Sequence, residues 1–532
     1  MTRLGFVLEA DSCIGCHACT VACKSEHDVP LGVNRTWVKY IETGEFPNTS
    51  RAFTVMRCNH CDDAPCMTIC PTSALFRADN GVVDFHDDDC IGCKSCMNAC
   101  PYDALYINPE TNTAQKCNFC NHRIEVGLEP SCVVVCPTEA IVVGDLDDPN
   151  SPISRIVARD PVVVRAPEQG TNPKVFYRGA DQASLDPTRS AIGSDGMIWA
   201  DTTPSHSTIS PVQISQNPSS VVARTAYTTA HELTWKSKVS GYLVTKAIAA
   251  GVMLFAALLT WLGGLDADQI AVGTGSSLTL RYQASVGVLP PLIAGAFLAM
   301  TGYLLVSDLK QPTRFHYLLT RGNRSSWLVK GAYVLMAFTA TCALWFMAVV
   351  ALGELDIAWI DEVGLMRILA VPVTLGALGC AGYTALLFGQ CEGRDLWQTP
   401  LLLPNLLAQA VVAGGATYAL IDVFLAVPDL TVIRSVFLGG LGGLGLLLAA
   451  EVTSHGTRHV ELATAEMTKG AYASRFWTGL VVGIAAPALL LVLALTGVAP
   501  TALNAGAGLC ALVGLFAYED AYVRAGQSVP LS

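Results

Sequence analysis

Sixteen of the 20 cysteines in this 532-residue chain lie between Cys13 and Cys136, in four groups of four. Two groups have the spacing C-x2-C-x2-C-x3-C, one has C-x2-C-x4-C-x3-C and one has C-x2-C-x11-C-x3-C. The groups are Cys13, Cys16, Cys19, Cys23; Cys58, Cys61, Cys66, Cys70; Cys90, Cys93, Cys96, Cys100; and Cys117, Cys120, Cys132, Cys136. Proline follows the last cysteine of three groups, as Pro71, Pro101 and Pro137. Intervals this regular indicate that these cysteines are the ligands of a prosthetic group.

These intervals are typical of [4Fe–4S] clusters, in which three closely spaced thiolates hold one cubane and a fourth reaches a neighbouring cluster. Structural zinc fits less well, because it uses separated C-x2-C pairs. Disulfides would need an oxidising compartment but not this repeated spacing. Since all sixteen positions are cysteine, we expect four complete [4Fe–4S] clusters with these residues as the metal ligands. The remaining cysteines lie in apolar sequence and are expected to be small core residues.

Short apolar segments follow the prolines and precede Cys90, as SALF, DALYI, EAIVV and GVVDFH. Such segments, with turns between them, are typical of short strands. We therefore expect a duplicated, ferredoxin-like α+β domain over residues 1–145. Residues 1–150 contain 10 Lys+Arg and 21 Asp+Glu, a net charge of −11. This acidity argues against nucleic acid as a partner, and serves either solubility or the docking of another subunit.

The second half of the chain has the character of a membrane protein. Only 14% of the whole chain is charged, against roughly a quarter in ordinary soluble domains. Apolar runs of about 20 residues, the length of a membrane-spanning helix, lie at 240–262, 284–307, 328–352, 366–389, 400–420, 432–452, 475–497 and 501–522. We expect an all-α bundle of eight transmembrane helices over residues 236–528; a buried soluble bundle is the less favoured alternative. Residues 146–235 are expected to form an extension packed on the cluster domain, then a linker from about 200, whose Ser/Thr/Pro-rich part is either ordered or disordered.

Basic residues are concentrated in the loops on one side of the expected bundle. They are Lys236, Lys238, Lys310, Arg314, Arg321, Arg324, Arg394, Arg458, Lys469, Arg475 and Arg524. The positive-inside rule predicts that this side, with the cluster domain, faces the cytoplasm of a bacterial or archaeal cell. The N-terminal MTRLGFVLEADSC has no apolar run or twin arginine, so we expect no export signal in it. Export by a partner that carries its own signal is the alternative.

The order of the cysteine groups and the residues around them resemble a known family. The motifs are CIGCHACTVAC (13–23), CNHCDDAPCMTICP (58–71), CIGCKSCMNACPYDALY (90–106) and CNFC…PSCVVVCP (117–137). They resemble the four-cluster electron-transfer subunit of the dimethyl sulfoxide reductase and polysulfide reductase family, over residues 3–180. The resemblance implies that the first group pairs with the fourth and the second with the third. The implied ligand sets are Cys13, Cys16, Cys19 and Cys136; Cys117, Cys120, Cys132 and Cys23; Cys58, Cys61, Cys66 and Cys100; and Cys90, Cys93, Cys96 and Cys70.

The loop after the second apolar run reads D-L-K-Q-P-T-R-F-H over residues 308–316. It is similar to the D-L-G-x-P-x-R-F signature of the NrfD/polysulfide-reductase membrane anchor, except that Lys310 stands where that family usually has glycine. Eight spans also match that anchor. The resemblance implies that this protein fuses the cluster subunit and the membrane anchor of one complex.

No pair of histidines lies within the spans at positions suited to haem, so we expect no haem. Electrons would then pass between the last cluster and menaquinone or ubiquinone. Candidate quinone-site residues near the cluster-facing edge are Tyr242, Lys246, Asp308, Arg314, His316, Gln390, Asp395 and Trp397. Ionisable residues inside spans, here Lys246 and Glu451, indicate function, unless they extend to the interface. His455 and His459, one helical turn apart, suit either a metal or a solvated loop face.

We derive three hypotheses for function. The first is an electron-transfer and quinone-reacting subunit of a membrane-bound molybdopterin oxidoreductase, whose molybdenum or tungsten lies in a large, separate catalytic subunit. The second is a module of a larger respiratory complex that links a haem, flavin or ferredoxin partner to quinone without molybdenum. The third, a scaffold with purely structural clusters, is disfavoured because four clusters serve no folding need. No segment resembles a substrate-converting domain, so we expect no substrate activity from this chain alone.

Overall fold

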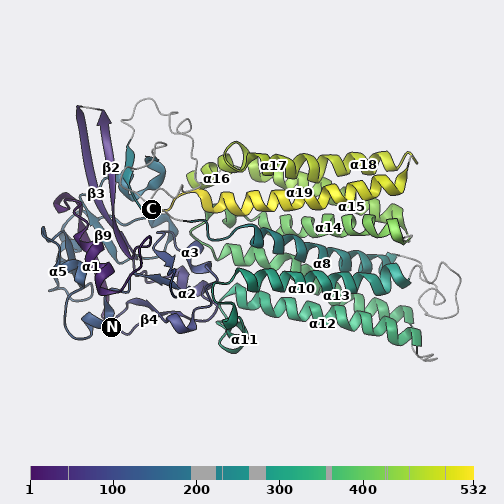
Figure 1. Cartoon of the computed structure of the whole chain (residues 1–532), viewed down its shortest axis with the longest axis horizontal. Coiled ribbons are helices and arrows are strands. Elements are labelled where there is room, and N and C mark those ends of the chain that lie inside the picture. Colours follow the sequence, from purple (N-terminus) through teal and green to yellow (C-terminus); the bar gives the residue numbers. More distant parts are fainter. Residues whose placement is uncertain are drawn as a thin grey trace.

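The computed structural model describes residues 2–45, 47–192, 223–229, 232–262, 283–354, 362–425, 427, 429–454, 456–497 and 499–532. A small α+β domain lies at one end of the molecule and a long bundle of nearly parallel helices at the other (Figure 1). Both chain termini lie at the α+β end (Figure 1). This arrangement confirms the predicted fold class of a ferredoxin-like domain followed by an all-α bundle.

The α+β domain repeats a small unit in which a short helix is followed by a two-stranded antiparallel hairpin. In one copy α2 (Pro65–Ile69) precedes β4 (Leu75–Arg77) and β5 (Val83–Phe85). In the other, α3 (Ser95–Ala99) precedes β6 (Leu105–Ile107) and β7 (Ala114–Lys116). Further helices are α1 (Ala18–Glu26), α4 (Asn121–Ile124), α5 (Ser131–Val134), α6 (Pro152–Arg159) and α7 (Gln182–Leu185). Helices α2 and α3 end directly before Cys70 and Cys100, so each unit fixes the position of a thiol.

A three-stranded sheet closes the domain at the end distant from the bundle. In it β1 (Leu4–Glu9) pairs antiparallel with β8 (Ile141–Asp145) and parallel with β9 (Val175–Arg178). The inner face packs as core, with Phe6 stacked on Phe119 at a ring distance of 4.1 Å. Strand β9 belongs to the expected extension, which therefore packs on the cluster domain as part of its sheet.

A long hairpin, β2 (Thr36–Glu45) with β3 (Asn48–Arg57), projects from the domain (Figure 1). Its sheet is completed by β11 (Arg224–Tyr227) and by β10 (Ala191–Ile192). We expected residues 224–227 to lie in a linker. They form a strand instead, because Thr225 is buried opposite Ile41 and completes the antiparallel pairing. Most of the Ser/Thr/Pro-rich stretch before them lies outside the described residues.

Eight helices are long and apolar enough to cross a membrane, which confirms the predicted number of spans within the described part of the chain. They are α8 (Ser237–Leu262), α10 (Leu289–Asp308, after a π-turn at Gln283–Val288), α12 (Trp327–Glu354), α13 (Glu362–Gly389), α14 (Leu402–Phe424), α15 (Leu430–Thr453), the run α17 (Ala473–Leu480)–π-turn (Val481–Ala485)–α18 (Ala486–Ala494), and α19 (Pro500–Ser528). Short helices α11 (Tyr317–Thr320) and α16 (Arg458–Thr468) lie in loops at the cluster-facing end. Large apolar side chains such as Leu446 and Leu375 are exposed around the bundle, as expected for a surface in contact with lipid and not with water.

Helices α8 and α14 form the centre of the bundle and approach very closely. A Cβ atom on Gly251 would lie 2.1 Å from the carbonyl oxygen of Ala410, and one on Gly414 would lie 2.4 Å from that of Gly251. Small residues permit such backbone contact between membrane helices. The close contact fixes the polar side chains of α14 relative to those of α8.

Candidate functional site

The cysteine loops of the first and third groups have the same backbone conformation. Gly15 and Gly92 have φ of 70° and 66°, and the residues two positions later, His17 and Lys94, have φ of 60° and 65°. This left-handed conformation suits glycine and turns successive backbone amides toward the thiols. The amide of Gly92, for example, donates to Cys90 Sγ at 3.4 Å.

Two cavities near the bundle are each lined by four cysteines. One is lined by Cys70, Cys90, Cys93 and Cys96, with Leu75, Phe85 and Ile91 among its apolar wall residues. The other is lined by Cys58, Cys61, Cys66 and Cys100, with Val83, Tyr102 and Leu105. Each cavity therefore takes three cysteines from one sequence group and the last cysteine of the other. Among the described residues, no three His, Cys, Asp or Glu side chains are grouped so as to hold one metal ion.

In the outer cysteine groups, thiols of the first group lie near thiols of the fourth. Burial raises the pKa of the Cys23 thiol, and the neighbouring thiols of Cys117, Cys132 and Cys120 raise it further. Burial likewise raises the pKa of Cys13, with a contribution from the thiol of Cys136. These thiols are therefore close enough to repel one another as thiolates, a repulsion that the positive iron of a bound cluster would relieve.

Arg57 is a buried cation placed among the outer thiols. Its guanidinium is 0% exposed, lies 4.4 Å from the centre of the Phe6 ring and donates to Cys132 Sγ at 3.4 Å. Although burial lowers the pKa of Arg57, the thiols of Cys132, Cys117 and Cys19 raise it. Its Nε and Nη2 atoms have no hydrogen-bond partner within the described part of the chain. A buried, incompletely paired guanidinium fits a site that holds a negatively charged, thiolate-ligated group.

The loop 308–316 binds the cysteine loop of the third group. Asp308 forms an ion pair of 2.7 Å with Lys94. Arg314 Nη1 donates to the carbonyl oxygens of Asp87 (2.7 Å) and Cys90 (3.0 Å). The backbone amide of Lys310 donates to the Gly92 carbonyl. Asp308 and Arg314, two of the quinone-site candidates, thus have polar atoms paired with the cluster domain.

Other candidates at this edge also bind loops. His316 is exposed, with Nδ1 at 3.1 Å from the Thr313 carbonyl oxygen. Gln390 accepts from the backbone amide of Trp327 and donates to the Ser325 carbonyl. Asp395 accepts from Gln169 Nε2 at 3.1 Å. His459 lies on α16, whereas His455 is outside the described residues, so the possible histidine pair stays untested.

Three buried aromatic rings connect the third cysteine loop to the bundle. Trp235 Nε1 donates to the carbonyl oxygen of Cys93 at 3.2 Å. The Trp235 ring stacks on Phe388 and on Trp397, with ring centres 5.6 and 5.5 Å apart, and those two rings lie 4.6 Å apart. Trp397, a quinone-site candidate, therefore lies between the cysteine cavity and the ends of the membrane helices.

Lys246 lies inside the bundle and does not extend to the membrane surface. It is 1% exposed, and Nζ donates to the Ala381 carbonyl (3.0 Å) and to Thr384 Oγ1. Nζ also lies 4.8 Å from the centre of the Tyr383 ring. Tyr242, one turn earlier on α8, is buried as well. Both candidates thus belong to a polar interior reached from the cluster-facing end.

Sequence reasoning missed several members of this polar interior. Asn405 and Gln409 on α14, and Tyr518, Glu519 and Tyr522 on α19, are all buried. The available signal was Glu519, an ionisable residue within an apolar run. The amides and tyrosines carry no comparable signal, because both residue types occur throughout membrane helices.

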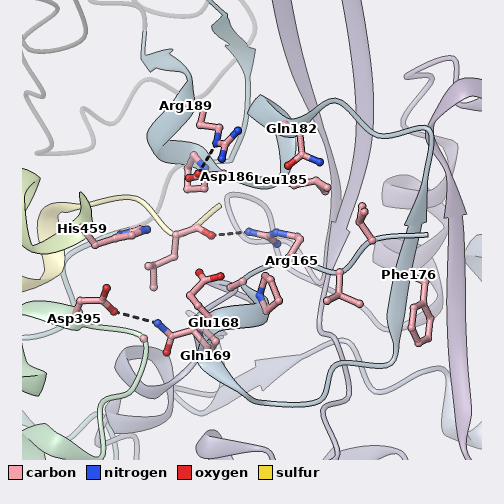
Figure 2. Close-up of a pocket in the computed structure, with 18 of the residues that line it drawn as sticks. Arg165, Glu168, Gln169, Phe176, Gln182, Leu185, Asp186, Arg189, Asp395 and His459 are labelled. Atoms are coloured by element: carbon pink, nitrogen blue, oxygen red, sulfur yellow. Dashed lines mark hydrogen bonds and ion pairs between the residues drawn. The ribbon is translucent and has the colours of Figure 1, made fainter. Parts of the chain in front are cut away.

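A separate polar cavity of about 510 Å³ lies where the extension, the cluster domain and the anchor loops meet (Figure 2). Arg165 Nη2 donates to the carbonyl oxygen of Leu531 at 2.6 Å, and Gln169 donates to Asp395 across it (Figure 2). Arg189 pairs with Asp186 on another wall. The Arg165 and Gln169 bonds tie the extension to the anchor, including its last residues.

Comparison with known proteins decides the family. Residues 226–529 match the family described as "Polysulphide reductase, NrfD". This protein belongs to the NrfD family. Residues 49–146 match the 4Fe-4S dicluster domain, so the cysteine domain of this NrfD-family protein is an iron–sulfur domain and its helical half makes it a multi-pass membrane protein.

The N-terminal third of the sequence is also similar to separate iron–sulfur subunits of reductases. It is 42% identical to the B subunit of tetrathionate reductase from Salmonella typhimurium, over 35% of this sequence and 76% of that protein. It is 36% identical to the arsenate respiratory reductase iron-sulfur subunit ArrB of a Shewanella species (33% and 95% covered) and 40% identical to the B polypeptide of polysulfide reductase from Wolinella succinogenes (33% and 93%). This confirms the predicted fusion of an iron–sulfur subunit with an NrfD anchor.

Proposed function

We propose that this protein is the electron-transfer and quinone-reacting subunit of a membrane-bound molybdopterin oxidoreductase. The observation that carries the proposal is the direct connection between a cysteine cavity and the membrane helices. The cavity of Cys70, Cys90, Cys93 and Cys96 is held by the 308–316 loop on one side and contacts Trp235 on the other. A redox group in that cavity would lie at the entrance of the bundle.

The sixteen cysteines would hold four [4Fe–4S] clusters, with the last cysteine exchanged within each pair of groups. The sets are Cys13, Cys16, Cys19 and Cys136; Cys23, Cys117, Cys120 and Cys132; Cys58, Cys61, Cys66 and Cys100; and Cys70, Cys90, Cys93 and Cys96. The two cavities and the proximity of the outer thiols support these sets. When bound, such clusters are one-electron carriers, and the protein sets their order from the outer end of the domain to the membrane.

The catalytic partner would dock at the outer end of the cluster domain. Large apolar side chains are exposed there around the first and fourth cysteine groups. They are Ile14, Val21, Leu31, Val126, Leu128, Val134 and Val135, with Leu31 91% exposed. Cys16, near Ile14 in the same loop, is itself exposed. An apolar patch on an acidic domain marks a protein interface, and here it would give a partner access to the outermost cluster.

Quinone would bind at the cluster-facing end of the bundle. Tyr242 and Lys246 offer hydrogen-bond donors inside it, and Trp397 offers an aromatic face beside Phe388. Asp308 and Arg314 would hold the cluster loop at this edge, and exposed His316 would lie where the headgroup enters. Menaquinone and ubiquinone both suit such a site.

We place the cluster domain on the cytoplasmic side, with working boundaries of 1–145, 146–235 and 236–528. The distribution of basic loop residues supports this side, although Arg314, Arg321 and Arg394 also bind the cluster domain. A cysteine introduced at Asn150, which is exposed and lies outside the proposed docking patch, tests it in oriented vesicles. It should react with a membrane-impermeant maleimide in inverted vesicles and not in right-side-out ones; the reverse pattern would place the domain outside.

Purification of the complex from membranes tests the function. We expect a large subunit with molybdenum or tungsten to copurify, about 16 iron atoms for each copy of this protein, four for each cluster, and quinone-dependent oxidation or reduction of the clusters followed by electron paramagnetic resonance. A haem or flavin partner without molybdenum or tungsten would instead support the respiratory-module hypothesis. If quinone neither oxidised nor reduced the clusters, the proposed function would be refuted.

A further inference from the structure

A series of buried polar side chains extends from the cluster-facing loops into the bundle. At its outer end Tyr522 Oη donates to the carbonyl oxygen of Leu396 at 3.2 Å and also contacts the Glu451 carboxylate. Tyr518 Oη donates to Glu451 Oε2 at 3.3 Å. Asn405 Nδ2 lies 3.4 Å from the same carboxylate oxygen and 3.2 Å from Tyr518 Oη. Glu451 is in the last turn of α15, so this end is next to the surface.

The set continues inward through side chains of α14 and α19 to α8. Gln409 Nε2 donates to Asn405 Oδ1 at 3.1 Å. Gln409 also hydrogen-bonds to the Glu519 carboxyl group, which interacts electrostatically with the ammonium group of Lys246. Lys246 in turn donates to Thr384. We call Tyr522, Tyr518, Glu451, Asn405, Gln409, Glu519 and Lys246 the polar chain.

The polar chain is costly for a membrane protein. Glu451, Glu519 and Lys246 are 5%, 2% and 1% exposed, and ionisable groups at such positions are expensive unless they serve a function. Glu451 Oε1 has no hydrogen-bond partner among the described residues. Apolar residues of similar volume would stabilise the bundle as well, so stability alone does not account for these buried charges. An unpaired oxygen at the outer end is free to accept a proton.

The polar chain consists of residues other than the three aromatic rings of the proposed electron route. The aromatic rings of Trp235, Phe388 and Trp397 connect the bundle to the Cys93 loop. The polar chain reaches the same end of the bundle through α14, α15 and α19. The neighbouring carboxylate Asp520 is excluded from it, because Asp520 pairs with Arg475 and Arg524.

We infer that the polar chain conducts protons between the cluster-facing surface and the quinone site, with Glu451 as its entrance and Glu519 and Lys246 as its inner end. The inference rests on the proposed quinone function. Reduction of one quinone to quinol takes two electrons, delivered singly by the clusters, and two protons, one bonded to each ring oxygen. Oxidation of quinol releases both. Clusters carry no protons, so the protein must supply a second route, and carboxyl groups joined by amides provide exchangeable sites along one.

The test uses E451Q and E519Q in the complete complex, with D520N as the matched control that removes a buried carboxylate from the same helix as Glu519 but not from the polar chain. We expect quinone-linked turnover to fall about 10- to 100-fold in both glutamine variants, which is at or below the smallest rate effect usually seen when a positioned proton-transfer group is lost. Turnover in D520N should stay within about twofold of the wild type. Dithionite reduction of the clusters and their paramagnetic spectra should stay unchanged in all three. The E451D variant should recover part of the turnover.

A readout independent of turnover is the infrared difference spectrum between oxidised and reduced complex. We expect a carboxyl C=O band that E451Q or E519Q removes and D520N retains. Normal quinone turnover and unchanged carboxyl bands in E451Q and E519Q would overturn the inference while leaving the quinone function intact. Loss of clusters in both glutamine variants and in E451D would also overturn it, since the residues would then be structural. If the wild-type complex showed no quinone turnover, the proposed quinone function would be refuted, and the proton-route inference would fail with it.

Discussion

The cluster domain and the membrane bundle both bury charged side chains, but of opposite kinds. Around the cysteines the buried charged groups are mainly cations, including Arg57 and Lys116, both 0% exposed. Inside the bundle they are mainly carboxylates, Glu451 and Glu519, beside the amides of α14. A permanent cation stabilises thiolate-bound negative charge without exchanging a proton, whereas a carboxyl group can take up and release one. Under the proposed function, electrons would cross the cysteine-lined domain, and protons would cross the carboxylate-containing interior of the bundle.

The strongest test of the cluster half is C70S. Cys70 belongs to the second sequence group but lines the cavity of the third. Its replacement should therefore remove the cluster next to the membrane. Quinone-linked turnover should then fall by about 100-fold or more. Iron content and paramagnetic spectra measure the loss. C510S, which alters a cysteine of α19 remote from the cavities, should keep every cluster. Retention of the membrane-proximal cluster in C70S would refute the exchanged ligand set.

The next largest effect is expected for R57M. Removing a fully buried cation leaves the surrounding thiolates uncompensated, at a cost of about 3–5 kcal/mol. The apparent melting temperature, followed by cluster absorbance, should fall, and the reduction potential of the cluster bound by Cys132 should become more negative, because an added electron meets less positive charge. R57K should recover much of both losses. An unchanged potential in R57M would show that the guanidinium does not act on the cluster.

Contact between the halves depends on the ion pair of Lys94 with Asp308, whose side chains are 8% and 19% exposed. A charged hydrogen bond of this kind contributes about 1.5–3 kcal/mol. K94M and D308N should each lower the melting temperature and slow electron exchange between the membrane-proximal cluster and quinone. The double variant should be less impaired than the sum of the two. If the losses of melting temperature and electron-exchange rate in the two single variants simply added in the double variant, the ion pair would not couple the two domains.

The smallest effect concerns Lys39 in the β2 strand. Burial lowers the pKa of Lys39 to about 7, with a further contribution from Arg165, and its Nζ has no hydrogen-bond partner in the described chain. Because the unfolded state binds more protons than the folded state between about pH 7 and the ordinary lysine value, wild-type stability should rise with pH across that window. K39M should be stabilised by about 1–2 kcal/mol below pH 7, and its advantage should shrink as pH rises. Melting curves across that range measure it, and parallel pH profiles would contradict the assignment.

The sequence allowed prediction of the features that local chemistry dictates. Cysteine spacing predicted the ligand groups, and run length predicted the eight spans that the structure has, because each property depends on neighbours along the chain. Lys246 was singled out since a charge within an apolar run is visible without a structure. The strand at 224–227 was not foreseen, because its pairing partner, Ile41, is remote in sequence.

The polar chain shows most clearly what sequence cannot provide. Asn405 contacts Glu451 and Tyr518 only because α14 packs between α15 and α19. Similarly, the motif at Asp308 and Arg314 was noticed, but its contact with the Cys90 loop depends on how the two halves dock. Helix periodicity defines which residues share a face, but not which faces meet.

The short connection between β11 and α8 has a consequence for how tightly the two halves must bind. Residues 228–236 span at most about 30 Å when extended, so the cluster domain stays at an effective concentration in the millimolar range above the bundle. The similar iron–sulfur subunits match only about a third of this sequence. Here dilution cannot separate the halves, and a docking surface of modest intrinsic affinity remains occupied at any protein concentration in the membrane.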